Sequence, residues 1–168
     1  NNFKFSLSTL RQMLRQHLPE DLQNTEIIHR SSSTIQLNSE LLNTHDVVQL
    51  QRGLALCGER SKVSNWSEIA EQTVLAYKAP FLSECYLEWA VTARQTLELQ
   101  VFDLAKRLLQ ELEKEEQWSK IIPVATHLMA LDRSNQWPCL LLMRSLRHSQ
   151  RPAEALRIFE QNRKYWLK

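Results

Sequence analysis

The opening of the chain, NNFKFSLSTLRQMLRQHL, places apolar and polar residues with the period of an α-helix. Its apolar positions recur at intervals of three and four residues and form one stripe: Phe3, Leu7, Leu10 and Leu14. Because Pro19 disfavours helical geometry in the residue before it, we expect the helix to end near Leu18. The apolar stripe is expected to be the buried face of this helix.

The face next to this stripe carries basic and hydroxyl groups. Lys4, Ser8, Arg11 and Arg15 repeat the same spacing one residue later. Arg and Lys on an exposed helix face bind phosphates, and Ser donates to a phosphate or to a base edge. The solvated side of an ordinary amphipathic surface helix has the same pattern, so periodicity alone leaves both interpretations open.

Two short β-prone runs follow the helix. Ile27 and Ile28 form the first run and residues 34–37 (TIQL) form the second, and three serines at residues 31–33 lie between them as turn residues. The pattern predicts a small β-hairpin. A helix followed by a hairpin is typical of the last helix and the wing of a winged helix-turn-helix.

The remainder of the chain has a helical pattern. In residues 44–58, Thr44 is the expected N-cap, Asp46 suits the first turn, and the apolar residues line one face. From Ser83 onward the pattern predicts helices to the end of the chain, with Ser134 as the N-cap of one of them.

A dense cluster of aromatic and apolar residues surrounds Pro80. Its members are Trp66, Tyr77, Phe81, Leu82, Tyr86 and Trp89. Such clusters belong to a core more often than to a ligand cage, so we expect these side chains to be core residues.

The apolar register of the second half repeats at a shift of 34 residues. Leu108, Leu109 and Leu112 correspond to Leu142, Met143 and Leu146, and Trp118, Ile121 and Ile122 correspond to Pro152, Ala155 and Leu156. This period is the length of a tetratricopeptide (TPR) helix pair. Two or three such pairs would stack into a short solenoid with a concave surface.

The composition favours helix and a cytoplasmic protein. The chain has only two glycines, which favours helix. Its net charge of +2 is too small for a general polyanion binder, so any nucleic-acid contact must be local. Its three cysteines form no C-x-x-C arrangement, which suits reduced thiols, and no apolar run approaches the length of a membrane span. We expect a cytoplasmic location and no membrane contact.

The sequence offers no constellation of catalytic residues. Its five histidines are scattered, no glycine-rich phosphate loop is present, and no Ser or Cys lies in a nucleophile motif. His127 is expected to be a satisfied or partly exposed helix residue rather than a metal ligand. We therefore expect no enzymatic activity, no metal and no cofactor.

Two sets of residues carry a resemblance to a known family. In the second half they are Tyr77, Pro80-Phe81-Leu82, Trp89, Arg94, Leu97, Leu131-Asp132, Met143-Arg144, Arg151, Glu154-Ala155-Leu156 and Arg163. In the first stretch they are Asn1, Lys4, Leu7-Ser8, Leu10-Arg11 and Leu14. The chain resembles SARP-type bacterial transcriptional activators, in which the end of an OmpR-like winged helix precedes a bacterial transcriptional activator domain. It departs from the family pattern at Thr9, where the family often has Arg, and at Ser33-Thr34, where the wing normally has Gly-Tyr.

The resemblance implies a mainly α-helical protein of two parts. Residues 1–43 would be the C-terminal part of a winged helix-turn-helix (the recognition helix and the wing), whose earlier elements would lie outside this chain. Residues 44–168 would be a TPR-like bacterial transcriptional activator domain. The chain would then be a transcriptional regulator or a fragment of one.

The same resemblance implies where DNA and protein would bind. The DNA-contacting residues would be Asn1, Lys4 and Ser8 toward base edges, and Arg11, Arg15, His29, Arg30 and Ser31 toward phosphates. Without the complete winged helix we expect weak, salt-sensitive binding to promoter DNA. Candidate protein-interaction residues are Trp118, Trp137, Arg144, Arg147 and Arg163. The protein partner would be RNA polymerase, a second copy of the chain or an adjoining domain.

Two alternatives remain open from the sequence. One is a TPR-type peptide-binding adaptor with no DNA role, in which Lys4 and Arg11 contact no nucleic acid. The other is a regulatory domain of a larger signalling ATPase. In either case the tryptophans named above could simply fill gaps between helices.

Overall fold

The computed structural model describes residues 2–16, 18, 20, 25–31, 34–38, 46–58 and 64–166. The chain divides into two compact units, Asn1–Gln49 and Leu50–Lys168. The predicted boundary between residues 43 and 44 lies outside the described residues and stays a prediction.

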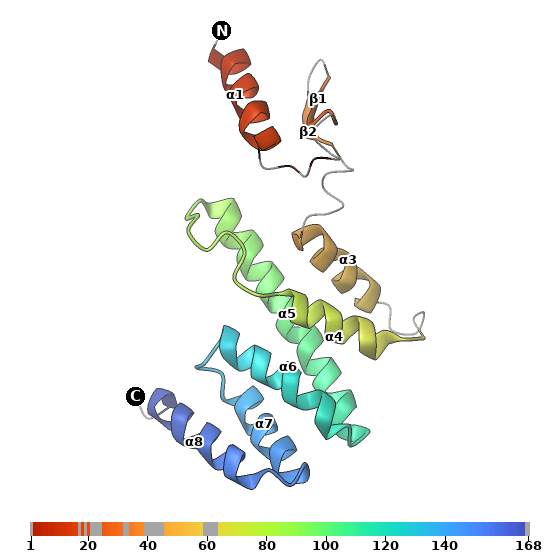
Figure 1. The fold of residues 1–168 in the computed structure, drawn as a ribbon, viewed down its shortest axis with the longest axis vertical. Helices are drawn as coiled ribbons and strands as arrows, with labels where there is room; N and C mark the ends of the chain where they lie inside the picture. The colour runs from red at the N-terminus through yellow and green to blue at the C-terminus, as the bar shows by residue number, and fades with distance from the viewer. Residues whose placement is uncertain are drawn as a thin grey trace. The chain divides into compact units, whose positions relative to one another are not determined.

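The first unit consists of a helix and a hairpin. Helix α1 (Asn2–Gln16) precedes strands β1 (Ile28–Arg30) and β2 (Ile35–Leu37), which pair antiparallel with Ile28 opposite Leu37 (Figure 1). The Ser31 amide donates to the Thr34 carbonyl over 2.9 Å and closes the turn. The predicted helix and hairpin are confirmed, because β-branched residues and a serine-rich turn select this local structure.

The buried side of α1 differs from the predicted apolar stripe. Leu10 is 47% exposed, whereas Leu7, Arg11 and Leu14 are partly buried. The side chain of Phe3 lies outside the described residues. The covered face is therefore rotated toward Arg11, since an arginine can bury its aliphatic stem while its guanidinium finds a hydrogen-bond acceptor.

Six helices account for most of the described part of the second unit. They are α3 (Asp46–Gly58, which begins just before the division), α4 (Trp66–Ala76), α5 (Glu88–Lys114), α6 (Trp118–Leu131), α7 (Gln136–His148) and α8 (Pro152–Trp166). From α4 to α8, successive helices pack side by side and alternate in direction (Figure 1). One core cluster runs through this stack and includes Val74, Leu108, Leu128 and Leu142. The expected helical second half is confirmed.

The turns after α5 and α7 have the same geometry 34 residues apart. Glu116 and Gln150 both adopt left-handed backbone angles, with φ of 55° and 59°. The amide that follows each of them donates to a carbonyl five residues earlier, from Gln117 to Leu112 and from Arg151 to Leu146, over 2.8 Å in both cases. This is a Schellman motif, which ends a helix and reverses the chain. The predicted 34-residue register thus reappears in backbone geometry.

Three predictions about local structure were wrong. Helix α5 begins at Glu88 rather than near Ser83, because residues 81–84 form a turn and residues 85–87 are not helical. Helix α7 is capped by Asn135, whose side chain accepts from the Trp137 amide over 3.2 Å, while Ser134 instead donates to Asp132. The third concerns the aromatic cluster.

The aromatic cluster around Pro80 is only partly core. Trp66 and Tyr77 are buried, at 5% and 4% exposed. Tyr86 and Trp89 are 85% and 59% exposed, because they lie in or just after the turns that precede the buried part of α5. The prediction therefore holds for Trp66 and Tyr77, at the two ends of α4, and fails for Tyr86 and Trp89, on either side of the first residue of α5.

Candidate functional site

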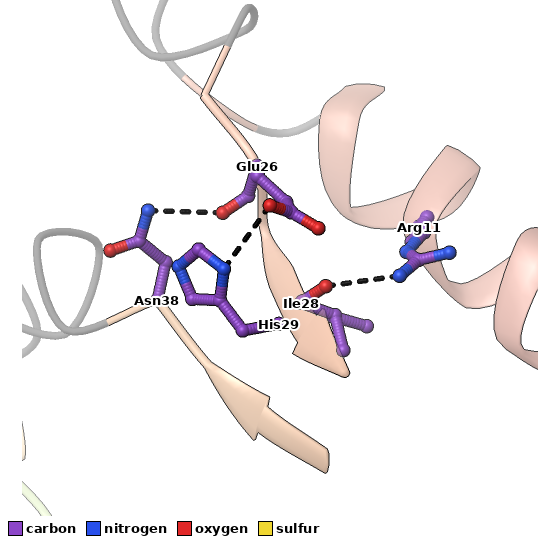
Figure 2. Close-up of polar contacts among 5 residues, drawn as sticks. All are labelled: Arg11, Glu26, Ile28, His29 and Asn38. Atoms are coloured by element: carbon purple, nitrogen blue, oxygen red, sulfur yellow. Dashed lines mark hydrogen bonds and ion pairs between the residues drawn. The ribbon is translucent and has the colours of Figure 1, made fainter. Parts of the chain in front are cut away.

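A hydrogen bond ties α1 to the hairpin. Nη2 of Arg11 donates to the carbonyl oxygen of Ile28 over 3.0 Å (Figure 2). Ile28 is 2% exposed. The guanidinium of Arg11 thus satisfies a backbone acceptor of β1 and positions the helix against the strand.

The base of the hairpin is held by Asn38. Its backbone N–H donates to the Ile27 carbonyl over 2.9 Å. Its buried side chain donates through Nδ2 to the Glu26 carbonyl over 3.0 Å (Figure 2). Together with the Arg11 bond, these contacts hold the described residues of α1, β1 and β2 as one small unit. Sequence reasoning missed Asn38, because a single Asn after a strand has no distinctive pattern.

Exposed polar groups line the rest of α1. Lys4, Ser8 and Arg15 are exposed, and α1 contains no acidic residue, so its outward side is positively charged. Ser8, Arg11 and Arg15 also border the same surface depression. Of the residues predicted to contact DNA on this helix, Asn1 lies outside the described residues.

The three candidate residues of the hairpin, His29, Arg30 and Ser31, are exposed. Nδ1 of His29 lies 3.2 Å from a carboxylate oxygen of Glu26 (Figure 2). The hydroxyls of Ser31 and Thr34 are 2.7 Å apart across the turn. Arg30 is exposed at the end of β1. The hairpin therefore presents a histidine and an arginine on a strand whose turn is fixed by side-chain hydrogen bonds.

The structure separates the five candidate protein-interaction residues. The ring of Trp118 stacks on His148, with centroids 4.1 Å apart and planes 6° apart, and Trp137 packs against the core. Both tryptophans thus fill space between helices. Arg163 is exposed on α8.

Two of the five lie together in a groove between α7 and α8. The groove has a volume of about 470 Å³. It is lined by Met143, Arg144, Arg147, Pro152, Ala155, Leu156 and Phe159. Arg144 also forms an ion pair with Glu113 of α5, whereas Arg147 is exposed and forms no ion pair among the described residues. The groove combines an apolar floor with a basic edge, and sequence reasoning missed its apolar residues Leu156 and Phe159 as candidates.

Arg94 fixes the turns that precede α5. Its guanidinium donates to the carbonyl oxygens of Phe81, Leu82 and Cys85 over 3.2, 2.5 and 3.1 Å. Leu82 has a φ of 45°, a left-handed conformation that is costly for a residue with a side chain. Three charge-assisted hydrogen bonds offset this cost and give Arg94 a structural role.

His127 and Tyr77 join α6 to the segment after α4. Nε2 of His127 donates to the Tyr77 carbonyl over 3.0 Å, so the prediction of a satisfied helix histidine is confirmed. Burial raises the pKa of the Tyr77 phenol, and Glu98 raises it further. Both residues therefore act as structural links in this geometry.

Burial also decides the chemistry of the cysteines. It raises the pKa of the thiols of Cys57 and Cys139, whereas Cys85 is only partly buried. A higher pKa lowers the thiolate fraction at neutral pH and makes both thiols poor nucleophiles.

Neither a metal site nor a membrane-crossing helix is present among the described residues. No group of three or more His, Cys, Asp or Glu side chains there is placed to hold a metal ion. In the same part of the chain, no helix combines the length and the apolar character needed to cross a bilayer.

Comparison with known proteins identifies the helical part. The family model of the bacterial transcriptional activator domain matches residues 46–166, from the start of α3 to the end of α8. Searches of curated proteins and of solved structures gave no significant match. The matched range covers most of the chain and contains Arg94, the paired Schellman turns and the α7–α8 groove. The chain therefore belongs to the bacterial transcriptional activator domain family.

Proposed function

We propose that this chain is part of a bacterial transcriptional regulator whose first unit contacts promoter DNA. In this proposal α1 is the recognition helix of a winged helix-turn-helix and the β1–β2 hairpin is its wing. The helical unit is a TPR-like domain that contacts another protein. The proposal places the regulator in the cytoplasm and gives the chain no catalytic role.

The observation that carries the proposal is the helix fastened to a hairpin directly before the transcriptional activator domain. The Arg11–Ile28 hydrogen bond supports this arrangement, because a recognition helix and a wing must keep a fixed geometry to engage one duplex. The charge of α1 agrees with it, since Lys4 and Arg15 are exposed on a helix without acidic residues.

Arg11 receives a revised role in this proposal. Its guanidinium already donates to the hairpin, so we assign it to positioning the helix against the wing rather than to a phosphate. Lys4, Ser8 and Arg15 keep the roles that the resemblance implied. His29, Arg30 and Ser31 remain the proposed contacts of the wing.

DNA binding by the complete gene product tests the proposal. Fluorescence anisotropy with a labelled duplex of about 25 base pairs would be followed between about 50 and 200 mM salt. Each lost phosphate contact lowers the slope of log K against log salt by about 0.9, so we expect Arg15→Ala to lower it by that amount. Lys106→Ala removes an exposed charge of α5 and is the matched control. Slopes that are identical for wild type, Arg15→Ala and Lys106→Ala would contradict the recognition-helix assignment.

A protein-binding adaptor is the second candidate function. The α7–α8 groove favours it, because an apolar floor with a charged rim is the usual anatomy of a protein interface. The occupant could come from RNA polymerase, from an adjoining domain or from a second copy. An adaptor without a DNA role predicts no salt-dependent binding to the duplex.

A further inference from the structure

The groove between α7 and α8 repeats an earlier surface of the same protein. Shifting its residues by 34 positions leads to the surface between α5 and α6. Met143, Ala155 and Phe159 correspond to Leu109, Ile121 and Ala125, and Arg147 corresponds to Glu113. The helices that form each surface are joined by a Schellman turn of the same geometry, at Glu116 and at Gln150.

The earlier surface is covered by a helix, namely α7. Glu113 forms an ion pair with Arg144 of α7, and Trp118 stacks on His148 at the end of α7. Beneath these contacts the apolar residues of the surface, Leu109, Ile121 and Ala125, are fully buried. The surface formed by α5 and α6 thus binds a third helix, α7.

The later surface is uncovered. Leu156 and Phe159 are 64% and 39% exposed, and Arg147 is exposed on the rim. The connecting turn is the same and the floor is again apolar, but no described helix of the chain lies on it. Exposed apolar residues gathered in one groove with a polar rim mark an interaction site.

Charge identifies the occupant. On the earlier surface a rim carboxylate, Glu113, faces a basic residue of the incoming helix. Its counterpart on the later surface is Arg147, so the rim charge there is positive instead of negative. A helix bound to this surface would pair with Arg147 through an acidic residue. Helix α1 of a second copy carries Lys4, Arg11 and Arg15 and no acid, so it would meet Arg147 with like charge.

We infer that the α7–α8 groove binds an amphipathic α-helix of a partner protein, apolar on one side and with an acidic residue opposite Arg147. The partner helix takes the place on α7–α8 that α7 takes on α5–α6. This inference rests on the protein-binding part of the proposed function and is independent of the DNA-binding part.

A peptide derived from α7 supplies the probe. The sequence Gln136–His148 would be synthesised with Ser in place of Cys139, with a fluorescein label and with a staple between positions 136 and 140, which are exposed in α7. One version keeps Arg144 and the other carries Arg144→Glu. Fluorescence anisotropy with the whole chain should give about five- to tenfold tighter binding of the Arg144→Glu peptide.

Three variants of the whole chain locate the binding site. Arg147→Glu should invert the preference between the two peptides. Lys106→Glu makes the same charge change on an exposed position of α5 and should leave the preference unchanged. Leu156→Asp should weaken binding of either peptide at least about tenfold without lowering the melting temperature, since Leu156 is largely exposed.

Two results would overturn the inference. Equal affinity for both peptides, with no effect of Arg147→Glu, would show that the charge of Arg147 does not select an acidic helix. Absence of peptide binding by a native chain that dimerises, with loss of the dimer in Leu156→Asp, would assign the groove to a second copy. Failure of the DNA-binding test would leave the peptide result standing, because Lys4 and Arg15 belong to the first unit.

Discussion

Replacement of Leu142 by alanine tests the repeat directly, because Leu142 is the counterpart of Leu108 under the 34-residue shift. The Leu142 side chain is 2% exposed and lies in the core cluster with Leu108 and Leu146. Truncation removes buried methyl groups and leaves a cavity that the surrounding helices only partly fill. We expect the free energy of unfolding to fall by about 3–4 kcal/mol.

Urea unfolding followed by tryptophan fluorescence measures this loss. All five tryptophans lie between Trp66 and Trp166, so the signal reports the helical unit and not the first unit. With a dependence of about 1.5 kcal/mol per molar urea, the midpoint should fall by about 2 to 3 M. The slope of the transition should stay the same, because the surface exposed on unfolding changes little.

The control for this measurement is Leu140→Ala, which makes the same chemical change two positions earlier on α7. Leu140 is 53% exposed, so its truncation should cost less than about 1 kcal/mol. If Leu142→Ala and Leu140→Ala shift the midpoint equally, the burial expected from the 34-residue register is refuted.

Three further changes have defined outcomes. Because burial raises the pKa of the Cys57 and Cys139 thiols, iodoacetamide at pH 8 should alkylate Cys85 first. The slower alkylation of Cys57 and Cys139 should accelerate as the pH rises, and Cys85→Ser should remove the fast phase. Arg94→Ala should increase chymotryptic cleavage after Tyr86, since the turns lose three hydrogen bonds, and unchanged cleavage would deny Arg94 that role. Gln150→Gly should raise stability by up to about 1 kcal/mol in urea unfolding, whereas Gln110→Gly inside α5 should lower it by about that amount; a loss at both positions would contradict the left-handed turn.

Much of the helical architecture follows from the sequence, because it depends on local periodicity. The apolar residues 108–112 and 142–146 recur in one register, and the structure buries Leu108, Leu112, Leu142 and Leu146. The hairpin was equally predictable, since Ile27, Ile28 and the serine turn act through nearby residues alone. The TPR-like character of the helical unit stays a proposal.

Other features depend on tertiary contacts that no local pattern contains. The start of α5 at Glu88 depends on Arg94, whose guanidinium donates to backbone carbonyls nine to thirteen residues earlier in the chain. Ser134 and Asn135 both have side chains that suit an N-cap, so the sequence leaves the first residue of α7 uncertain by one position, and the structure has Asn135 as the cap.

The candidate site was harder to predict than the fold. Periodicity placed Arg11 on the face next to the apolar stripe, but it could not say that the hairpin would cover that face. The groove depends on two helices that meet only after folding, so Leu156 and Phe159 gave no signal as a pair. Of the two basic residues of the groove, Arg144 belongs to the family pattern in the sequence and Arg147 does not.

The position of α8 at the end of the helical stack has a consequence for local opening. In a linear array the protection of each element is the sum of its own stability and the contacts with its neighbours. Helix α7 packs against α6 and α8, whereas α8 packs against α7 and leaves Leu156 largely exposed. Amide hydrogens of α8 should therefore exchange earlier than those of α6 and α7. A helix seated on the α7–α8 groove would supply the missing neighbour, so occupancy of the groove could be read from the exchange rate of α8.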